Sequence, residues 1–187
     1  MFFKYNLIDQ SIFIKKIPQQ FSDIDFDQIK KDALESYKNK KVLSTNKFSP
    51  EINYYKVKDR KDNLWIYEFI RDHFRQATLQ KTKNTLIMTE SAYVVLNTNS
   101  DITSHNHINE YDINNSPDYT AVAVIDADKD SFIEINYEGG RKRNMKQRIP
   151  LIPMEVIVFN AELQHRYLLN KNLKNTIVLS LKLQLFW

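Results

Sequence analysis

Eight short segments that predict strands follow one another closely in the C-terminal half of the chain, and their spacing limits the fold more than any other feature. Clusters of Asn, Asp, Gly and Pro separate the segments, as is usual for strands that end in turns. The segments are Ala92–Asn97, Thr103–Glu110, Tyr119–Asp126, Ser131–Tyr137, Met145–Leu151, Glu155–Asn160, His165–Leu169 and Thr176–Phe186. The intervals between them are too short for crossover helices, so the strands can pair only in antiparallel fashion. This pattern predicts a double-stranded β-helix, which is a jelly-roll arrangement.

Residues 1–90 have a different pattern, with two amphipathic segments that predict helices. The first helix begins in a capping pattern at Ser22 and Asp25 and continues to about Tyr37. The second covers about Asp62–Leu79, and short strands are expected near residues 12–17 and 52–57. The fold class is therefore α+β and mainly β, in a single domain over residues 1–187. Residues 1–90 form a helical annex with supporting strands, and residues 91–187 form the jelly-roll core.

Composition excludes several classes of function. With 2 Gly, the chain lacks the glycine-rich loops that bind dinucleotides or phosphates. With 0 Cys, it lacks disulfides, cysteine-based zinc sites and a thiol nucleophile. No apolar run reaches the roughly 18 residues of a membrane span, and the N-terminal sequence MFFKYNLIDQ lacks a signal-peptide core. We expect a soluble protein with no membrane partner, in the cytoplasm of a bacterium or of a phage-infected host cell.

The net charge of +4 comes mostly from lysine, in a chain that is also rich in isoleucine and asparagine. All three residue types have AT-rich codons, so a biased genome accounts for the excess of positive charge. Proteins that bind phosphates usually depend on arginine for bidentate contacts. We therefore do not expect nucleic acid as a partner.

Three of the four histidines fall in the β-rich half of the chain, at His105, His107 and His165. The first two are two residues apart on a predicted strand, which places both imidazoles on one face. In a rolled antiparallel fold, the strand that begins at His165 can return beside the strand of His105. Three imidazoles suit Fe, Zn, Cu or Ni and leave coordination positions open. An isolated H-x-H pattern is also a weak motif, so a chance meeting of surface or core histidines stays open.

The residues around these histidines form two motifs, Asp101–His107 and Pro153–Phe159 followed by His165. From about Glu90 onward, the sequence resembles the catalytic core of Fe(II)/2-oxoglutarate-dependent oxygenases. It resembles most the small phage and bacterial group whose first motif contains H-x-H. The resemblance implies a dioxygenase that hydroxylates a C–H bond of an unidentified substrate. It also implies Fe(II) held by the three histidines, with 2-oxoglutarate as the small-molecule cofactor.

The sequence departs from this family at the ligands and at the cofactor site. The usual middle ligand is a carboxylate, and here His107 takes its place unless Glu110 or Asp112 supplies one. The usual arginine of the last strand, which binds the distal carboxylate of 2-oxoglutarate, is absent. The candidates that remain for the cofactor are Lys174, Lys146, Arg148 and Tyr93.

Two other functions remain open. A non-catalytic jelly-roll protein, such as a phage structural or host-interaction module, would explain the absent arginine. A cupin-type metalloprotein would explain an H-x-H motif followed by Glu110 and later by His165, although the glycine-rich turn of cupins is missing. Turnover of 2-oxoglutarate separates the dioxygenase from both, because neither rival requires this cofactor.

Overall fold

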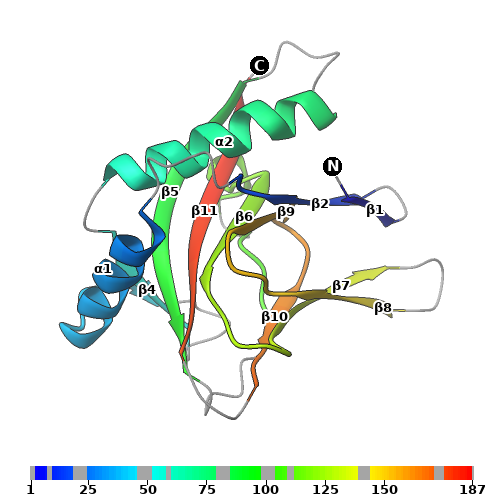
Figure 1. Cartoon of the computed structure of the whole chain (residues 1–187). Helices are drawn as coiled ribbons and strands as arrows, with labels where there is room; N and C mark the ends of the chain where they lie inside the picture. Colours follow the sequence, from blue (N-terminus) through cyan, green and yellow to red (C-terminus); the bar gives the residue numbers. More distant parts are fainter. Residues whose placement is uncertain are drawn as a thin grey trace.

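Two antiparallel sheets form the centre of the computed structural model (Figure 1). The structure describes residues 3–7, 10–18, 25–45, 52–57, 60–78, 85–97, 104–108, 112–138, 144–170 and 175–186. The strands are β1 (Phe3–Leu7), β2 (Gln10–Lys16), β3 (Val42–Thr45), β4 (Asn53–Lys56), β5 (Thr85–Leu96), β6 (Tyr119–Asp126), β7 (Phe132–Glu138), β8 (Asn144–Pro150), β9 (Glu155–Asn160), β10 (His165–Leu168) and β11 (Thr176–Phe186). The helices are α1 (Phe26–Lys38) and α2 (Arg60–Thr78), and Ile113–Asn115 forms a short 3-10 turn.

The larger sheet, here called the major sheet, has the order β1-β2-β9-β6-β11-β5-β4-β3. The minor sheet has the order β10-β7-β8 and lies against one face of the major sheet (Figure 1). Every strand pairing within the described ranges is antiparallel. The prediction of a mainly β fold with a jelly-roll core and N-terminal helices is therefore confirmed.

The major sheet is buried on both faces. In β6, Ala121 and Ala123 contact the apolar cluster that includes the helices, while Val122 and Val124 contact the cluster shared with the minor sheet. We call the face toward the minor sheet the inner face and the face toward the helices the helix face. Burial on both faces explains why β6 reads as a continuous apolar run instead of an alternation.

Both helices lie over the helix face of the major sheet (Figure 1). Asp25 is the N-cap of α1, and its carboxylate accepts a hydrogen bond of 2.9 Å from the backbone N–H of Gln28. The sequence placed Ser22 in the capping pattern, and Ser22 lies outside the described residues. The helix begins at Phe26 because the carboxylate of Asp25 satisfies a backbone donor that would otherwise have no partner.

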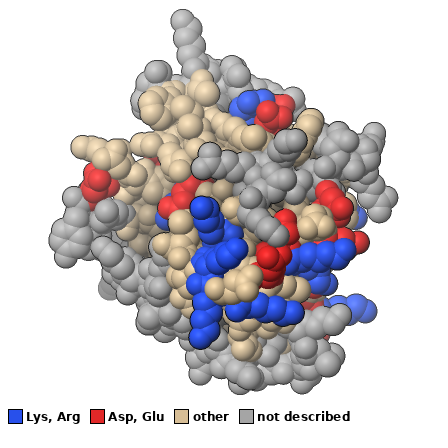
Figure 2. Space-filling view, turned by 90° about the vertical axis from the view of Figure 1, so that its left-hand side faces the viewer, with Lys and Arg blue, Asp and Glu red and all other residues tan. Residues whose placement is uncertain are grey.

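The helix side of the molecule carries both signs of charge. Figure 2 shows lysine or arginine side chains beside acidic side chains on the face where α1 lies. Lys30 of α1, for example, forms an ion pair with Asp126 of β6. None of the helices in the described part of the chain is long and apolar enough to cross a membrane.

The outer face of the minor sheet carries an ion cluster around Glu134 of β7, which has no exposed surface. Its carboxylate accepts hydrogen bonds from Arg148 Nε at 2.8 Å and from Arg166 Nε at 2.9 Å. Lys146 Nζ lies 3.4 Å away. Burial by itself raises the pKa of Glu134, but the two arginine hydrogen bonds and the charges of Arg166 and Lys146 outweigh burial and hold this pKa below its usual value. The carboxylate is therefore ionised at neutral pH.

Replacing this residue, Glu134→Gln, should lower the free energy of unfolding by about 1–2 kcal/mol at neutral pH, because three cations lose their counter-charge but stay solvated. A carboxyl group with a lowered folded pKa contributes stability above its unfolded pKa of about 4.3, and this contribution disappears as the pH falls through the folded pKa. The difference between wild type and variant in urea unfolding should therefore shrink as the pH falls below the unfolded pKa of about 4.3. A difference that stays constant over this range would contradict the assigned ion cluster.

Candidate metal centre

Backbone hydrogen bonds bring the two histidine motifs together. The N–H of His105 donates to the carbonyl of His165 at 2.9 Å, and the N–H of His165 donates to the carbonyl of His105 at 2.8 Å. This reciprocal pair forms an isolated antiparallel bridge, so the two side chains leave the backbone on the same face. The N–H of His107 donates to the carbonyl of Ala161 at 3.0 Å. The predicted pairing of the two motifs is therefore present, although the described residues 104–108 form a bridge and not the strand predicted over Thr103–Glu110.

The three imidazole rings lie against one another. Their centroids are separated by 4.3 Å for His105 and His165, 5.1 Å for His107 and His165, and 5.4 Å for His105 and His107. One ring nitrogen from each residue can be chosen so that all three lie within 4.8 Å of one another. Because metal–nitrogen bonds are about 2.0–2.1 Å long, two nitrogens on one ion are at most about 4.2 Å apart, so the rings would have to move closer together for one ion to bind all three.

His165 has the protonation pattern that a metal ligand needs. Its Nδ1 lies 3.1 Å from the carbonyl oxygen of Leu163. A carbonyl oxygen can only accept, so Nδ1 carries the proton and Nε2 keeps its lone pair. The Nε2 atom is buried and has no hydrogen-bond partner among the described residues. A buried nitrogen without a partner is costly, and a bound cation would satisfy it.

The surroundings favour the neutral forms of His107 and His165. Burial lowers the pKa of His165 well below its usual value, and the charges of His105 and His107 lower it further. The pKa of His107 is lowered in the same way by burial, then by the charge of His105 and then by that of Lys182. Only a neutral imidazole can bind a metal, so the lone pairs are available at neutral pH.

The described residues supply no carboxylate to this cluster. Asp112 is exposed, and both of its carboxylate oxygens accept hydrogen bonds of 3.0 Å from Asn115 Nδ2. Glu110 lies outside the described residues. Within the described part of the chain, the candidate ligands are therefore three imidazoles.

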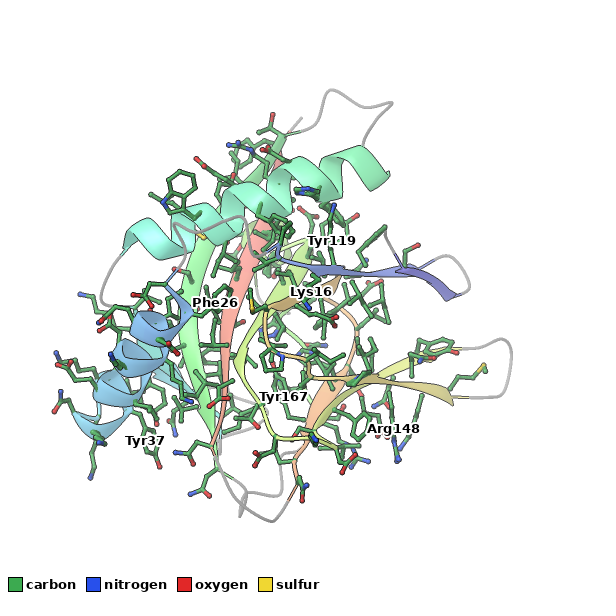
Figure 3. The ribbon with its side chains drawn as sticks, viewed as in Figure 1. Lys16, Phe26, Tyr37, Tyr119, Arg148 and Tyr167 are labelled. Atoms are coloured by element: carbon green, nitrogen blue, oxygen red, sulfur yellow. The ribbon has the colours of Figure 1, made fainter. Side chains whose placement is uncertain are left out.

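The structure does not bring the three described cofactor candidates, Tyr93, Lys146 and Arg148, to the histidines. Tyr93 of β5 is fully buried in the apolar cluster on the helix face, on the other side of the major sheet. Lys146 and Arg148 lie on the outer face of the minor sheet with Glu134. In Figure 3, Arg148 lies at the outer side of the minor sheet, whereas Tyr167 lies between the two sheets. Lys174 lies outside the described residues.

Four side chains that were not predicted from sequence lie on the inner face of the major sheet, the side on which the histidines lie. Lys182 of β11 and Thr120 of β6 are opposite each other in the strand register and lie on the inner face, since their neighbours Leu181 and Ala121 belong to the helix-face cluster. The other two are Glu90 of β5 and Tyr54 of β4, and Lys182 contacts both. The sequence does contain one sign of Lys182, because it is the single lysine within the apolar run of the last predicted strand, Thr176–Phe186.

A separate hollow lies on the helix face, lined by residues that include Phe13, Phe69 and Val158. His73 also lines it, and His73 Nδ1 donates to the carbonyl of Phe69 at 2.8 Å. This hollow is on the opposite side of the major sheet from the three histidines. It is therefore distinct from the candidate metal centre.

Neither a protein-family model nor a curated protein matches the sequence. Solved structures do match the fold. A prolyl-4-hydroxylase from Pseudomonas putida superposes with a TM-score of 0.65 and 8% identity over 95% of each chain. An oxidoreductase of the 2OG-Fe(II) oxygenase family from Burkholderia pseudomallei gives a TM-score of 0.52 and 10% identity, over 98% of this chain and 73% of that chain. At these identities, the likeness shows a shared fold.

Proposed function

We propose that the chain is an Fe(II)/2-oxoglutarate-dependent dioxygenase, and that His105, His107 and His165 hold the iron. The observation that carries this proposal is the buried Nε2 of His165, which has no partner among the described residues and lies beside two further imidazoles. The cluster lies inside a jelly roll whose structural neighbours include 2OG-Fe(II) oxygenases. Assignment to the small phage and bacterial group, and to the cytoplasm, stays a prediction.

The residues of this chain have separable roles at such a centre. His165 is fixed by the carbonyl of Leu163, so its Nε2 points at the ion without a tautomer change. His105 is fixed through its backbone bridge to His165. Bound Fe(II) and 2-oxoglutarate would supply the oxidising chemistry, and the protein would supply ligands, open positions and a dry pocket.

A set of three neutral ligands changes the charge of the site. A carboxylate ligand would cancel one of the two positive charges of Fe(II), whereas three imidazoles cancel none. The ion would then attract an anionic chelating ligand more strongly. This is the electrostatic reason to expect that an organic anion such as 2-oxoglutarate completes the coordination.

A jelly-roll metalloprotein that binds no 2-oxoglutarate is the second candidate. Lys182 is the lysine, among the described residues, whose charge helps to lower the pKa of His107. It already forms an ion pair with Glu90. This pairing favours a site that has lost its cofactor. A cupin-type metalloprotein is one form of this second candidate, since it also requires a metal and no 2-oxoglutarate.

The two candidates differ in turnover. Iron-loaded protein should convert 2-oxoglutarate to succinate in air even without its main substrate, slowly and only in the presence of O2. The His165→Ala variant should show no succinate above the metal-free blank, because the iron is lost. If wild-type protein binds both iron and 2-oxoglutarate but forms no succinate, the dioxygenase proposal fails.

A further inference from the structure

Two arginines and a lysine gather around the carboxylate of Glu134 on the outer face of the minor sheet. Strand register places Arg166, Glu134 and Arg148 opposite one another on three neighbouring strands. Lys146 lies two residues before Arg148, on the same face of β8. Because Ile133 of β7 belongs to the apolar cluster between the sheets, residue 134 and its partners point away from that cluster, as Figure 3 shows for Arg148.

This cluster carries more positive charge than its carboxylate can neutralise. Arg148 Nε donates to Glu134 Oε2 at 2.8 Å, and Arg166 Nε donates to Glu134 Oε1 at 2.9 Å. Lys146 Nζ lies 3.4 Å from Oε1. Three positive charges and one negative charge leave a net charge of +2 on this face. One cation would be enough to balance Glu134, so the carboxylate does not account for the other two.

The positive groups of the cluster are accessible from solvent. The side chains of Arg148 and Lys146 are 63% and 53% exposed, whereas that of Glu134 has no exposed surface. Among the described residues, neither Nη group of Arg148 has a hydrogen-bond partner, since its contact with the carboxylate is made through Nε. Glu134 therefore holds the guanidinium in place and leaves both Nη groups available to donate to an anion.

A half-buried aromatic ring lies beside these cations. Phe132 of β7 is in register with Leu168 on one side and with Pro150 on the other, and the three side chains form an apolar row on the outer face. Two residues along a strand span about 7 Å, so this row is the direct neighbour of the row that contains Glu134. The outer face therefore presents donors for phosphate groups next to a ring on which a nucleobase can stack.

We infer that the outer face of the minor sheet binds single-stranded nucleic acid, with phosphates held by Arg148 and Lys146 and a base stacked on Phe132. This inference goes beyond the proposed dioxygenase function and does not depend on it, since none of these residues belongs to the metal centre. The total charge of the chain predicts no nucleic-acid partner, but a total does not show where the charges lie. Cations beside an aromatic ring on an open sheet face are typical of proteins that bind single strands.

A single strand fits this face better than a duplex or an acidic protein does. In a duplex the faces of the bases are stacked on one another, so Phe132 would contact no base. An acidic protein would bring carboxylates for Arg148 and Lys146, but a carboxylate offers no flat face to the ring. Each nucleotide of a single strand carries a phosphate and an accessible base together, which matches the adjacent rows of this sheet.

Fluorescence anisotropy of a labelled oligothymidylate of about 12 nucleotides measures this binding on the full chain, between about 50 and 200 mM NaCl. Each cation that contacts a phosphate of a single strand contributes about 0.7 to the slope of log K against log salt concentration. Arg148→Met and Lys146→Met should therefore each lower this slope by about 0.7 and weaken binding about three- to tenfold at the lowest salt. Phe132→Leu should weaken binding about fivefold or more without changing the slope, because stacking releases no ions.

Arg71→Met is the matched control. Arg71 Nε also donates to a carboxylate, that of Asp72, and its side chain is 39% exposed, but it lies on α2 on the helix side. This variant should keep the wild-type affinity and slope. Lys146→Met leaves both arginine hydrogen bonds to Glu134 in place, so it tests the charge without disturbing the rest of the cluster. Circular dichroism checks that each variant is folded.

Competition with unlabelled nucleic acids and with polyglutamate identifies the partner. The single strand should compete at least about fivefold better than a duplex of the same length or than polyglutamate of the same charge. The inference is overturned if wild-type protein does not bind the oligothymidylate at about 50 mM NaCl, or if Arg148→Met and Lys146→Met both keep the wild-type affinity and slope. Equal competition by the duplex overturns the stacked base, and equal competition by polyglutamate would assign the face to acidic proteins instead.

Discussion

Replacing His165 with alanine should weaken metal binding by more than about 100-fold, since even changes to residues behind the ligands cost about 10–100-fold. His165 contacts both other histidines and has the buried Nε2 without a partner among the described residues. The variant therefore loses the candidate ligand whose free ring nitrogen is already buried and oriented. Titration with Co(II), followed through its visible absorbance, measures the affinity directly.

His73→Ala is the control for this variant. His73 is hydrogen-bonded to the carbonyl oxygen of Phe69 and lies on the helix face, away from the three histidines. Its removal should therefore leave the affinity for Co(II) unchanged. His107→Ala provides a second test at a partly buried position, where truncation disturbs the core less. Co(II) affinities of His165→Ala and His107→Ala that both equal wild type would show that these histidines do not bind the metal.

Phe159→Ala should lower the free energy of unfolding by about 3–5 kcal/mol, the usual range for removing a fully buried phenylalanine. Phe159 of β9 has no exposed surface, belongs to the apolar cluster between the sheets, and meets the ring of His165 edge-on at 4.8 Å. The cavity would lie directly beside the ring of His165. We therefore expect the variant to bind Co(II) more weakly as well as to unfold at lower urea.

Phe159→Leu is the matched control, since it keeps most of the buried volume and should cost less than about 1.5 kcal/mol. Urea unfolding of the metal-free proteins separates the effect on packing from the effect on the metal. A loss below about 1 kcal/mol for Phe159→Ala would contradict the burial of this residue between the sheets.

The bounds of strands were predicted best where the strands are apolar and buried. The predicted bounds of Tyr119–Asp126, Glu155–Asn160 and Thr176–Phe186 agree with those of β6, β9 and β11. These strands are bounded by turn residues, and burial leaves little choice of residue type along them. Their apolar character alone could not distinguish which sheet face each side chain occupies.

Strands with exposed positions were predicted less well. β5 begins at Thr85, seven residues before the predicted Ala92, because its first part alternates irregularly between exposed and buried positions. That part is held by pairing with β11, which extends from Leu96 to Thr85 and contains an irregularity between Lys182 and Leu183. Such long-range pairing is not encoded in the local pattern of either strand.

The candidate metal ligands were easier to predict from sequence than the candidate cofactor residues. The histidines could be selected from sequence because the chain has 4 of them and two share a strand-like spacing. The position of Tyr93 on the helix face and of Lys146 on the outer face depends on how the sheets roll up. Lys182 was not among the predicted residues, because the apolar run of the last strand does not show by itself which of its side chains lie on the inner face of the sheet.

An anaerobic titration tests most directly whether three neutral histidines hold Fe(II) with positions left open for 2-oxoglutarate. Metal-free protein receives Fe(II) and then 2-oxoglutarate, while the weak visible charge-transfer band of the chelate is followed, with His165→Ala as the blank. We expect a band that saturates with one equivalent of each and is absent from the blank. Iron binding without a band would contradict the cofactor assignment, and a failure to bind iron would contradict the metal centre itself.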